Sequence, residues 1–304
     1  MVYTITLNPC IDYTVNIKEW QRGKINRTRS EECYVGGKGI NVSIVLRNLG
    51  NETVAMGFIG GFTGAEIKRL LNEKHKVETD FIQIEGNSRI NVKVMSGDET
   101  QFNGAGPFIP QDAIDELFKK LSVLKSGDFL VMAGSIPSCM SKDTYEDIMA
   151  FLKDKGVNFV VDATKELLLN TLKHKPFLIK PNNHELEELF GVKLNGFDDV
   201  YTYAEKLREM GARNVIVSLG KYGAILVSEN GDKTYLQAPD GDVVDTVGSG
   251  DSVVAGFLSE FINSGDYVKA FYRGVATGSA TAFSETLATK EESDELFNKI
   301  YKIK

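Results

Sequence analysis

The sequence predicts a layered α/β fold in which helices cover both faces of a mostly parallel sheet. From about residue 110 onward, short apolar runs rich in β-branched and aromatic residues alternate with amphipathic segments long enough to be crossover helices. Apolar runs without polar alternation indicate strands that are buried on both faces. A chain of 304 residues with 42% hydrophobic residues can bury a core of this size.

Apolar runs mark the expected strands, and apolar residues at helical spacing mark the expected helices. Buried strands are predicted at 129–132, 159–161, 177–179 and 215–217. Crossover helices are predicted at 111–124, 142–155, 184–190 and 199–210, followed by helices at 251–263 and 267–283. Because strand and helix alternate here, the strands are expected to be mostly parallel.

The N-terminal third has a different pattern. Residues 88–95 alternate strictly between polar and apolar side chains, and a turn at 96–98 leads to a return strand at 99–103. With an extended N-terminal segment, this hairpin is expected to form a small β-sheet lid, made of segments 12–35 and 88–104 inserted in a single domain. A lid of this kind has an edge strand that a second subunit could cover, so a homodimer through the lid is expected.

The two faces of the predicted hairpin differ in chemistry, because successive side chains of a strand point to opposite sides. One face is apolar and is expected to pack against the protein. It carries Ile90, Val92 and Val94. The other face is polar and would then look at a ligand. It carries Arg89, Asn91 and Lys93.

The balance of charge restricts the classes of ligand. Lys and Arg number 35 and Asp and Glu 42, so the net charge is −7 at pH 7, and no basic block would attract nucleic acid or an anionic membrane. An anionic substrate must therefore be held by a few placed basic side chains and by oriented backbone N–H groups. A small-molecule ligand is expected, and nucleic acid and membrane partners are not.

The cysteines and histidines predict neither a disulfide framework nor a metal cluster. Cys10, Cys33 and Cys139 are few and scattered, which fits a reducing cytoplasm. No apolar run reaches the ~18 residues of a membrane helix. The histidines lack catalytic partners at a recognisable spacing and are expected on the surface. They are His75, His174 and His184.

The most informative segment is 245–252, Asp-Thr-Val-Gly-Ser-Gly-Asp-Ser, which leads directly into a predicted helix. Gly248 and Gly250 allow consecutive N–H groups to converge at the helix N-terminus, an arrangement that binds phosphate or a developing oxyanion. Asp251 beside them could accept the proton of an attacking hydroxyl. An ordinary Gly-rich turn with an acidic first helical turn is the alternative. Neither a Walker A motif nor a dinucleotide fingerprint is present.

A second Gly-rich segment, Gly-Gly-Lys-Gly-Ile-Asn at 36–41, also opens a predicted helix. Its glycines permit close approach of the backbone to a ligand, Lys38 supplies a positive charge, and Asn41 can both donate and accept hydrogen bonds. The segment suits a polyhydroxylated or phosphorylated small molecule, although alone it is also an ordinary helix start. Asp12, after the first predicted strand, could bind sugar hydroxyls or serve as a turn residue.

Two further segments follow predicted strands. In Lys-Pro-Asn-Asn-His-Glu at 180–185, Asn182 and Glu185 fit a helix capping box. They fit equally a pair of groups that hold a hydrated Mg²⁺, with Lys180 able to reach a phosphate. The loop 218–223 is either a hairpin turn or one wall of a nucleotide pocket.

In combination, these segments resemble the signatures of the ribokinase-like (PfkB) carbohydrate kinases. The segment 36–41 near the start, Asn182-x-x-Glu185 in the middle and 245–251 near the end have the order and separation typical of that family, and the resemblance spans essentially the whole chain. It implies a layered α/β/α fold with a mostly parallel central sheet and a small β-sheet lid. It also implies phosphoryl transfer from ATP, with Mg²⁺, and leaves a monovalent cation open.

Other stretches are similar to the sugar-phosphate branch of this family, which contains 1-phosphofructokinases and tagatose-6-phosphate kinases. They are Thr-Ile-Thr-Leu-Asn-Pro-x-x-Asp at 4–12, Lys38, and Ser-Arg-Ile-Asn-Val-Lys at 88–93. The last stretch, with Glu-Thr-Gln-Phe-Asn at 99–103, most resembles the 1-phosphofructokinases. It implies phosphorylation of fructose 1-phosphate at C6. Tagatose 6-phosphate is the alternative acceptor, and a non-catalytic sugar-phosphate sensor is the alternative from another class.

The resemblance also implies roles for individual positions. Asp251 would be the general base, and the N–H groups of Gly248, Ser249 and Gly250 the anion hole. Asp12, Gly37 and Asn41 would orient the sugar hydroxyls. Lys38 and Arg89 would be the main candidates to bind the acceptor's own phosphate, with Lys24, Arg27, Asn91 and Asn103 as weaker ones. The ATP site would be lined by Lys180, Asn182, Ser218, Gly220, Lys221, Gly223, Gly250 and part of the segment 276–284. Asn182 and Glu185 would act on the metal through water.

Two positions depart from the family pattern. Ser249 stands where Ala is most frequent in the second signature, a change that leaves the backbone N–H in place. The segment 133–138, Ala-Gly-Ser-Ile-Pro-Ser, differs from the commoner Ser-Gly-Ser-Leu-Pro form, which weakens the assignment of Ser135 to substrate binding.

Overall fold

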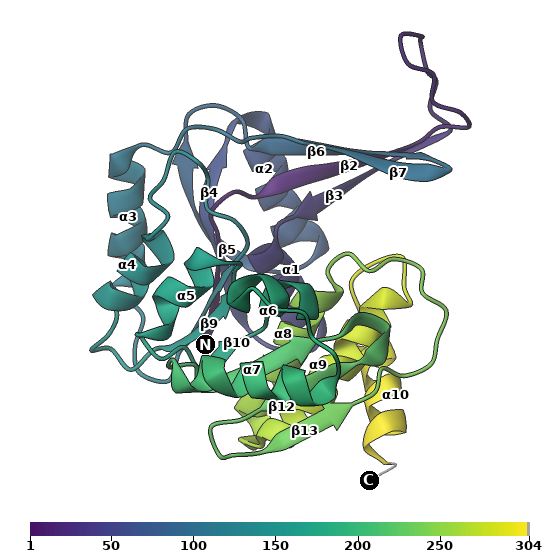
Figure 1. Cartoon of the computed structure of the whole chain (residues 1–304). Helices are drawn as coiled ribbons and strands as arrows, with labels where there is room; N and C mark the ends of the chain where they lie inside the picture. Colours follow the sequence, from purple (N-terminus) through teal and green to yellow (C-terminus); the bar gives the residue numbers. More distant parts are fainter. Residues whose placement is uncertain (303–304) are drawn as a thin grey trace.

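Two β-sheets organise the computed structural model, which describes residues 1–302 (Figure 1). The larger sheet has nine strands in the spatial order β13 (Lys233–Leu236), β12 (Ala224–Val227), β11 (Asn214–Ser218), β10 (Leu178–Ile179), β9 (Asn158–Asp162), β8 (Phe129–Ala133), β1 (Val2–Thr6), β4 (Thr53–Gly60) and β5 (Glu78–Ile84). All strands from β11 to β5 run parallel, and β12 and β13 are antiparallel additions at one edge.

The smaller sheet is the lid. Its strands lie in the order β3 (Ser30–Gly36), β2 (Cys10–Asn16), β6 (Arg89–Ser96) and β7 (Asp98–Asn103). β6 and β7 form an antiparallel hairpin, and β2 pairs with β3 antiparallel and with β6 parallel. In Figure 1 the lid projects from the body of the molecule as a flat extension.

Helices cover both faces of the larger sheet (Figure 1). One face is covered by α3 (Gln111–Leu121), α4 (Thr144–Phe151), α5 (Glu166–Leu172), α6 (Asn183–Phe190) and α7 (Phe197–Glu209). The other is covered by α1 (Lys38–Asn48), α2 (Gly61–Arg69), α8 (Ser249–Ser264) and α9 (Tyr267–Ala282), with α10 (Lys290–Tyr301) packed on α9. A π-helical turn, Leu70–Lys74, extends α2, and a short 3-10 helix, Gly220–Tyr222, follows β11.

Successive residues of the central strands enter different cores. In β8, Leu130 and Met132 pack in the core beneath α3 to α7, whereas Phe129 and Val131 pack in the core beneath α8 and α9. Because both faces of the sheet are buried, these strands contain unbroken apolar runs instead of alternating polar and apolar residues.

The parallel strands bring distant segments together at their carboxyl ends. β9 ends at Asp162, β10 leads directly to Lys180, and β11 ends at Ser218. Ligand sites in open α/β sheets form at this edge, because the loops that follow the strands converge there.

These arrangements confirm the predicted layered α/β fold, its mostly parallel sheet and its small β lid. The predicted strands and helices are all present. Helices α2, α5 and α10 are additions to the predicted set, and α5 spans only seven residues, too few for a helical repeat to be recognised.

The hairpin of β6 and β7 differs from the prediction in the face that it buries. Ile90 is 40% exposed, whereas Asn91, on the opposite face, is 7% exposed. The prediction that the apolar face packs against the protein is therefore wrong for Ile90, although Val94 is buried. The polar face turns inward because its hydrogen-bond donors find acceptors in the segment 8–12.

The histidines are also less exposed than predicted. His184 is exposed, but His75 and His174 are half-buried. Burial lowers the pKa of His75, and within residues 1–302 Nε2 of His174 is buried without a hydrogen-bond partner. The prediction of three surface histidines therefore holds for one of them.

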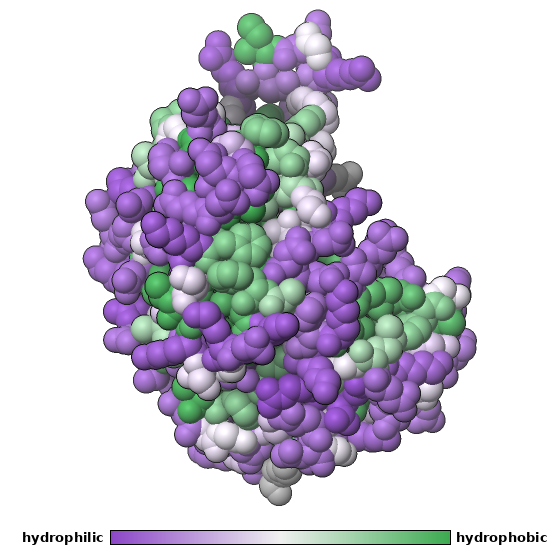
Figure 2. All heavy atoms as spheres, turned by 90° about the vertical axis from the view of Figure 1, so that its left-hand side faces the viewer, coloured by the Kyte–Doolittle hydropathy of each residue, from purple (hydrophilic) through white to green (hydrophobic). Residues whose placement is uncertain are grey.

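The surface mixes polar and apolar side chains, as expected for a sequence with 42% hydrophobic residues. In Figure 2, which shows the side of the molecule that includes α3 and α4, apolar side chains lie in small areas separated by polar ones. Of the helices in the described part of the chain, none combines the length and apolar character needed to cross a membrane.

Candidate active site

Asp251 lies in the first turn of α8 and is only 5% exposed. Its Oδ2 accepts a hydrogen bond from Nδ2 of Asn41 at 2.8 Å. Burial, reinforced by the negative charge of Asp162, raises the pKa of Asp251 to about 6. The ammonium groups of Lys38 and Lys180 and the bond from Asn41 act in the opposite direction. The carboxylate is therefore more basic than an ordinary Asp, yet mostly ionised at pH 7.

The segment before this carboxylate has the geometry of an anion-binding helix N-terminus. Gly248 is left-handed (φ 78°), and a Cβ there would lie 2.5 Å from the side chain of Leu287, so the position requires glycine. Within residues 1–302, the N–H groups of Gly248 and Gly250 have no hydrogen-bond partner. The N–H of Ser249 instead donates to the carbonyl of Thr246 at 3.2 Å. Among the described residues, two of the three N–H groups expected to form the anion hole therefore have no other acceptor, whereas the N–H of Ser249 is used in a turn.

Two lysines from different segments converge beside this helix. Lys180 is 6% exposed, and its Nζ lies 3.0 Å from the position of a Cβ on Gly250. Lys38 is the first residue of α1. Both ammonium groups contact Oδ2 of Asp162, at 3.6 Å for Lys180 and 3.2 Å for Lys38. Asp162 is not among the predicted site residues, and the only signal for it in the sequence is its place after a buried strand.

Opposite charges control ionisation in this cluster. Burial favours the neutral form of Asp162, but the ammonium groups of Lys180 and Lys38 outweigh burial and hold the pKa of Asp162 below its usual range. Asp162 is in turn the main reason that the pKa of Lys38 is raised. These opposite charges therefore keep both Asp162 and Lys38 ionised at neutral pH.

Asn182 and Glu185 form the capping box of α6, as one interpretation of the sequence predicts. Oδ1 of Asn182 accepts from the N–H of Glu185, and Oε2 of Glu185 accepts from the N–H of Asn182, both at 2.8 Å. Asn182 also forms an isolated bridge with Ser218, so the segment 180–185 and the loop 218–223 lie side by side.

A hydrated Mg²⁺ is compatible with this capping box, because the second carboxylate oxygen of Glu185 takes no part in it. Across the described residues, no group of three or more His, Cys, Asp and Glu side chains could enclose a metal. A metal at this place would therefore be held mostly by waters and phosphates, the arrangement that Mg²⁺ favours.

The inward face of the lid carries a network centred on Asp12. Nδ2 of Asn91 donates to Oδ1 of Asp12 at 2.9 Å, and Nζ of Lys93 lies 3.4 Å from its Oδ2. The thiol of Cys10 also donates to Oδ1, at 3.1 Å, and burial raises the pKa of Cys10 to about 12, so the thiol keeps its proton. Arg89 donates through Nε to the backbone ahead of β2. Cys10 was not among the predicted site residues.

Other predicted residues lie on the margins of these groups. Asn103 pairs with Asn91 in the β6–β7 ladder and thus shares its face of the lid. Ser135 follows Gly134, whose Cβ position would lie 3.8 Å from Cβ of Lys38.

Two predicted phosphate ligands are not brought into the cluster. Lys24 and Arg27 are exposed in the loop between β2 and β3, which extends beyond the lid (Figure 1). The remaining predicted residues lie in two places: Gly37 precedes α1, while Gly220, Lys221 and Gly223 belong to the loop after β11. At the end of α9, Thr281 bonds to Ser252 at 2.7 Å and fixes the segment 276–284 against α8.

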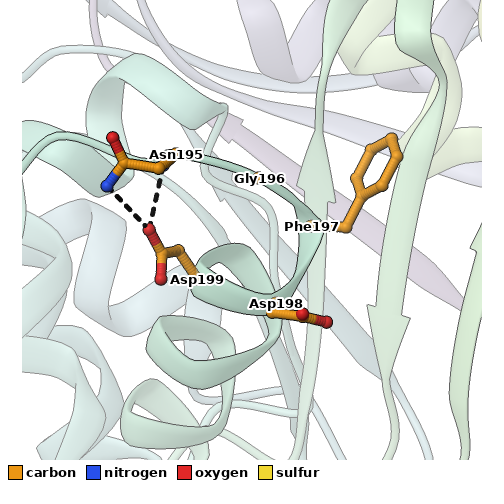
Figure 3. A pocket seen from close by; sticks show the side chains of 5 residues that line it. All are labelled: Asn195, Gly196, Phe197, Asp198 and Asp199. Carbon is orange, nitrogen blue, oxygen red and sulfur yellow. Dashed lines mark hydrogen bonds between the residues drawn. The ribbon is translucent and has the colours of Figure 1, made fainter.

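A pocket of about 340 Å³ lies outside this cluster, at the start of α7 (Figure 3). It is lined by Asn195, Gly196, Phe197, Asp198 and Asp199. Asn195 donates from its backbone N–H and from Nδ2 to Oδ2 of Asp199, at 2.9 and 3.2 Å. Phe197 points away and packs on Tyr235, with ring centres 4.5 Å apart. The pocket carries two carboxylates, and the side chain of Asn195 is already bonded to one of them, so the pocket does not suit a phosphorylated ligand.

Comparison with known proteins shows similarity along the whole chain. A model of the pfkB family of carbohydrate kinases matches residues 1–294. The chain is 44% identical over 300 residues to a 1-phosphofructokinase of Bacillus subtilis, covering 99% of this chain and 98% of the relative. It is 34% identical over 302 residues to a D-tagatose-1-phosphate kinase of Bacillus licheniformis, with coverage of 99% and 98%.

Solved structures have the same fold. Phosphofructokinase-2 from Escherichia coli in complex with substrates and products gives a TM-score of 0.93 at 27% identity, covering 99% of each chain. The same protein in complex with potassium gives a TM-score of 0.92 at 26% identity, again covering 99% of each chain.

Substitution of Ser249 tests whether its buried hydroxyl destabilises the start of α8. Within the described residues its Oγ is buried without a hydrogen-bond partner, whereas Oγ of Ser252 bonds to Oγ1 of Thr281. An unpaired buried hydroxyl costs ~1–3 kcal/mol. We expect Ser249→Ala to leave the free energy of unfolding in urea unchanged or to raise it by ~1 kcal/mol. The matched variant Ser252→Ala should lower it by ~1–2 kcal/mol. An equal loss in both variants would contradict this account of Ser249.

Proposed function

Because this chain belongs to the pfkB family of carbohydrate kinases, we propose that it transfers the γ-phosphoryl group of ATP to the C6 hydroxyl of fructose 1-phosphate. The chain is a phosphotransferase with an alcohol group as acceptor. The observation that carries the proposal is the position of Asp251, a buried base beside the N–H groups of Gly248 and Gly250 and the ammonium group of Lys180. These groups supply a proton acceptor and a place for the transferring phosphoryl group.

Asp251 accepts the proton of the C6 hydroxyl as the hydroxyl oxygen attacks the γ-phosphorus, and the bond from that phosphorus to the bridging oxygen breaks to release ADP. Asn41 bonds to one carboxylate oxygen, Oδ2, and leaves Oδ1 for the acceptor. Since the pKa of Asp251 is raised to about 6, the carboxylate holds the transferred proton better than an ordinary Asp would.

The N–H groups of Gly248 and Gly250 and the ammonium group of Lys180 stabilise the negative charge of the transferring phosphoryl group. These donors are positioned before the reaction begins, because α8 and the segment after β10 are held by packing and by ion pairs. Bound Mg²⁺ neutralises phosphate charge. In this proposal Asn182 and Glu185 hold it through water, and Ser218, Gly220, Lys221 and Gly223 line the ATP site.

The acceptor binds between the main sheet and the inward face of the lid. Asp12, Asn91 and Asn103 offer hydrogen-bonding groups to the sugar hydroxyls, with Gly37 and Asn41 on the opposite wall. Arg89 and Lys38 bind the acceptor's own phosphate. The side chain of Lys38 is 42% exposed, so its ammonium group is accessible to a ligand although it contacts Asp162.

A tagatose phosphate is the second candidate acceptor. It is favoured by the 34% identity with a D-tagatose-1-phosphate kinase. Tagatose 6-phosphate is the alternative that the sequence suggests, and the catalytic groups cannot separate these sugars because each has one free primary hydroxyl. A non-catalytic sugar-phosphate sensor is disfavoured, because a sensor has no use for a buried base beside an anion site.

We further propose that the lid mediates a homodimer. Ile90 and Phe102 are 40% and 52% exposed on its outer face, and Trp20 contacts Phe102 edge to face at 6.3 Å. Exposed apolar side chains grouped on one sheet face are typical of a surface that another chain covers.

The first prediction concerns the base. Asp251→Asn should lower kcat by ~10²–10⁴-fold while ATP affinity, measured by calorimetry, changes little. In the wild type, log kcat/KM should fall below a pH of about 6, where Asp251 takes up its proton. Turnover of the variant within ~10-fold of wild type would exclude Asp251 as the base.

Measuring the resistance of Asp251→Asn to urea distinguishes a loss of activity from a loss of folding. Ionising a carboxyl whose folded pKa is raised costs free energy, and this cost is present above pH 6 and disappears as the pH falls. Asp251→Asn should therefore be more resistant to urea than wild type at pH 8, with a smaller difference at pH 5. Lower stability at pH 8 would contradict the raised pKa.

The second prediction ranks acceptors by kcat/KM in a coupled ADP-release assay with Mg·ATP. Fructose 1-phosphate is expected to exceed tagatose 6-phosphate, tagatose 1-phosphate, fructose 6-phosphate and free sugars. A preference for a tagatose phosphate would keep the mechanism and change the substrate. No turnover of any of them would favour the sensor.

The third prediction concerns assembly. Light scattering should show a dimer at micromolar concentration, and Phe102→Glu should convert it to a monomer. Val123→Glu is the matched control, because Val123 is 70% exposed just after α3, away from the lid. A monomeric wild type, or a Phe102→Glu dimer, would exclude this interface.

A further inference from the structure

Asp162 has no role in the reaction described above, although it is the most enclosed charge at the site. It is 3% exposed at the end of β9. The carbonyl of Asp162 accepts the N–H of Gly134, which ties the end of β9 to the loop after β8. The backbone of Asp162 is therefore held by the sheet, and its enclosed carboxylate is the common contact of both lysines.

The two lysines that Asp162 contacts arrive from unrelated parts of the fold. Lys38 starts α1, directly after the lid strand β3, and Lys180 follows β10. Two ammonium groups that share one carboxylate oxygen repel each other, so this arrangement persists only while the carboxylate is charged.

The nearby base is left out of this pairing. Within the described residues, no ion pair of 4.0 Å or less joins Asp251 to a lysine, and the bond to its carboxylate comes from the neutral amide of Asn41. A lysine paired with Asp251 would make it a weaker base, because an adjacent positive charge favours the ionised form.

We propose that Asp162 is a positioning residue that fixes the ammonium groups of Lys38 and Lys180 where ligand phosphates bind and keeps them from pairing with Asp251. This inference rests on the proposed function only for its kinetic consequence. The separation of the lysines from the base is a property of the unliganded protein and is measurable without turnover.

The charged groups around Asp251 determine the sign of the effect. Asp162 on β9 is the negative neighbour, and Lys38 on α1 and Lys180 after β10 are the positive ones, while Asn41 is neutral. Asp162→Asn removes the negative charge and also leaves two lysines uncompensated. Both changes favour ionised Asp251, so its pKa must fall.

The test is a carbon-13 NMR titration of the Asp251 carboxyl in wild type and in Asp162→Asn. We expect the midpoint to move down by about one pH unit or more in the variant. The control is Asp128→Asn, because Asp128 is equally enclosed, 3% exposed, but lies ahead of β8 and pairs with the chain N-terminus. An unchanged midpoint in Asp162→Asn, or an equal shift in Asp128→Asn, would overturn the proposal.

Kinetics give the second readout. With fructose 1-phosphate, the acid limb of log kcat/KM should move to lower pH in Asp162→Asn, and kcat at pH 8 should fall by up to ~10-fold for each unit by which the pKa of Asp251 is lowered, because the base is weaker. If Asp162→Asn does not fold, Asp162→Glu keeps the charge while moving the carboxylate. That variant should retain the wild-type titration midpoint of Asp251 and lose rate, and a midpoint displaced downward in it would overturn the proposal. A displaced titration without any kinase activity would support the role of Asp162 and refute the proposed function.

Discussion

The carboxylate of Asp162 contacts two ammonium groups at the carboxyl ends of the parallel strands. This contact constrains much of the structure around it. Charges removed from water must be paired, since an isolated buried charge costs several kcal/mol. Asp162 meets this requirement for Lys180, which is 6% exposed, and the more exposed Lys38 adds a second ammonium group beside the buried carboxylate. The pairing therefore fixes the start of α1 and the segment after β10 relative to the end of β9. It leaves Asp251 bonded to a neutral amide and able to act as a base.

The parallel topology explains how such a cluster forms from a linear chain. Each charged group stands where a strand ends or a helix begins, so its backbone is held by regular hydrogen bonding and not by a loop alone. Groups supported in this way are placed more accurately than groups on loops, and accuracy matters because phosphoryl transfer depends on alignment and on preorganised charge. The capping box of Asn182 and Glu185 uses the same principle, since the bonds that start α6 also fix the orientation of the Glu185 carboxylate.

Local patterns explain which features the sequence could predict. The Gly-rich helix start with Asp251, the capping box and the buried strands each depend on residues close together in the chain. Asp162 could not be predicted because its partner Lys38 is 124 residues away, and a lone Asp after a strand has no distinguishing pattern. Alternation identified the two faces of the β6–β7 hairpin but not which one is buried, because that depends on acceptors in the segment 8–12. The turn that engages the N–H of Ser249 depends on backbone geometry that residue types do not specify.

The lid and the main sheet carry different parts of the proposed site, and this separation has a consequence for evolution. Arg89 and Asn91, which are assigned to the acceptor, belong to the lid, whereas the base and the charged cluster, with Lys38 for the acceptor's phosphate, belong to the main sheet and its helices. The lid's network centres on Asp12, and the charged cluster centres on Asp162, and no ion pair within residues 1–302 connects the two. In the proposed site, a mutation in the lid would therefore alter the contacts to the sugar while the base and the charged cluster stay intact. Such a separation lets one scaffold diversify among related sugars by a few substitutions, with little risk to its chemistry.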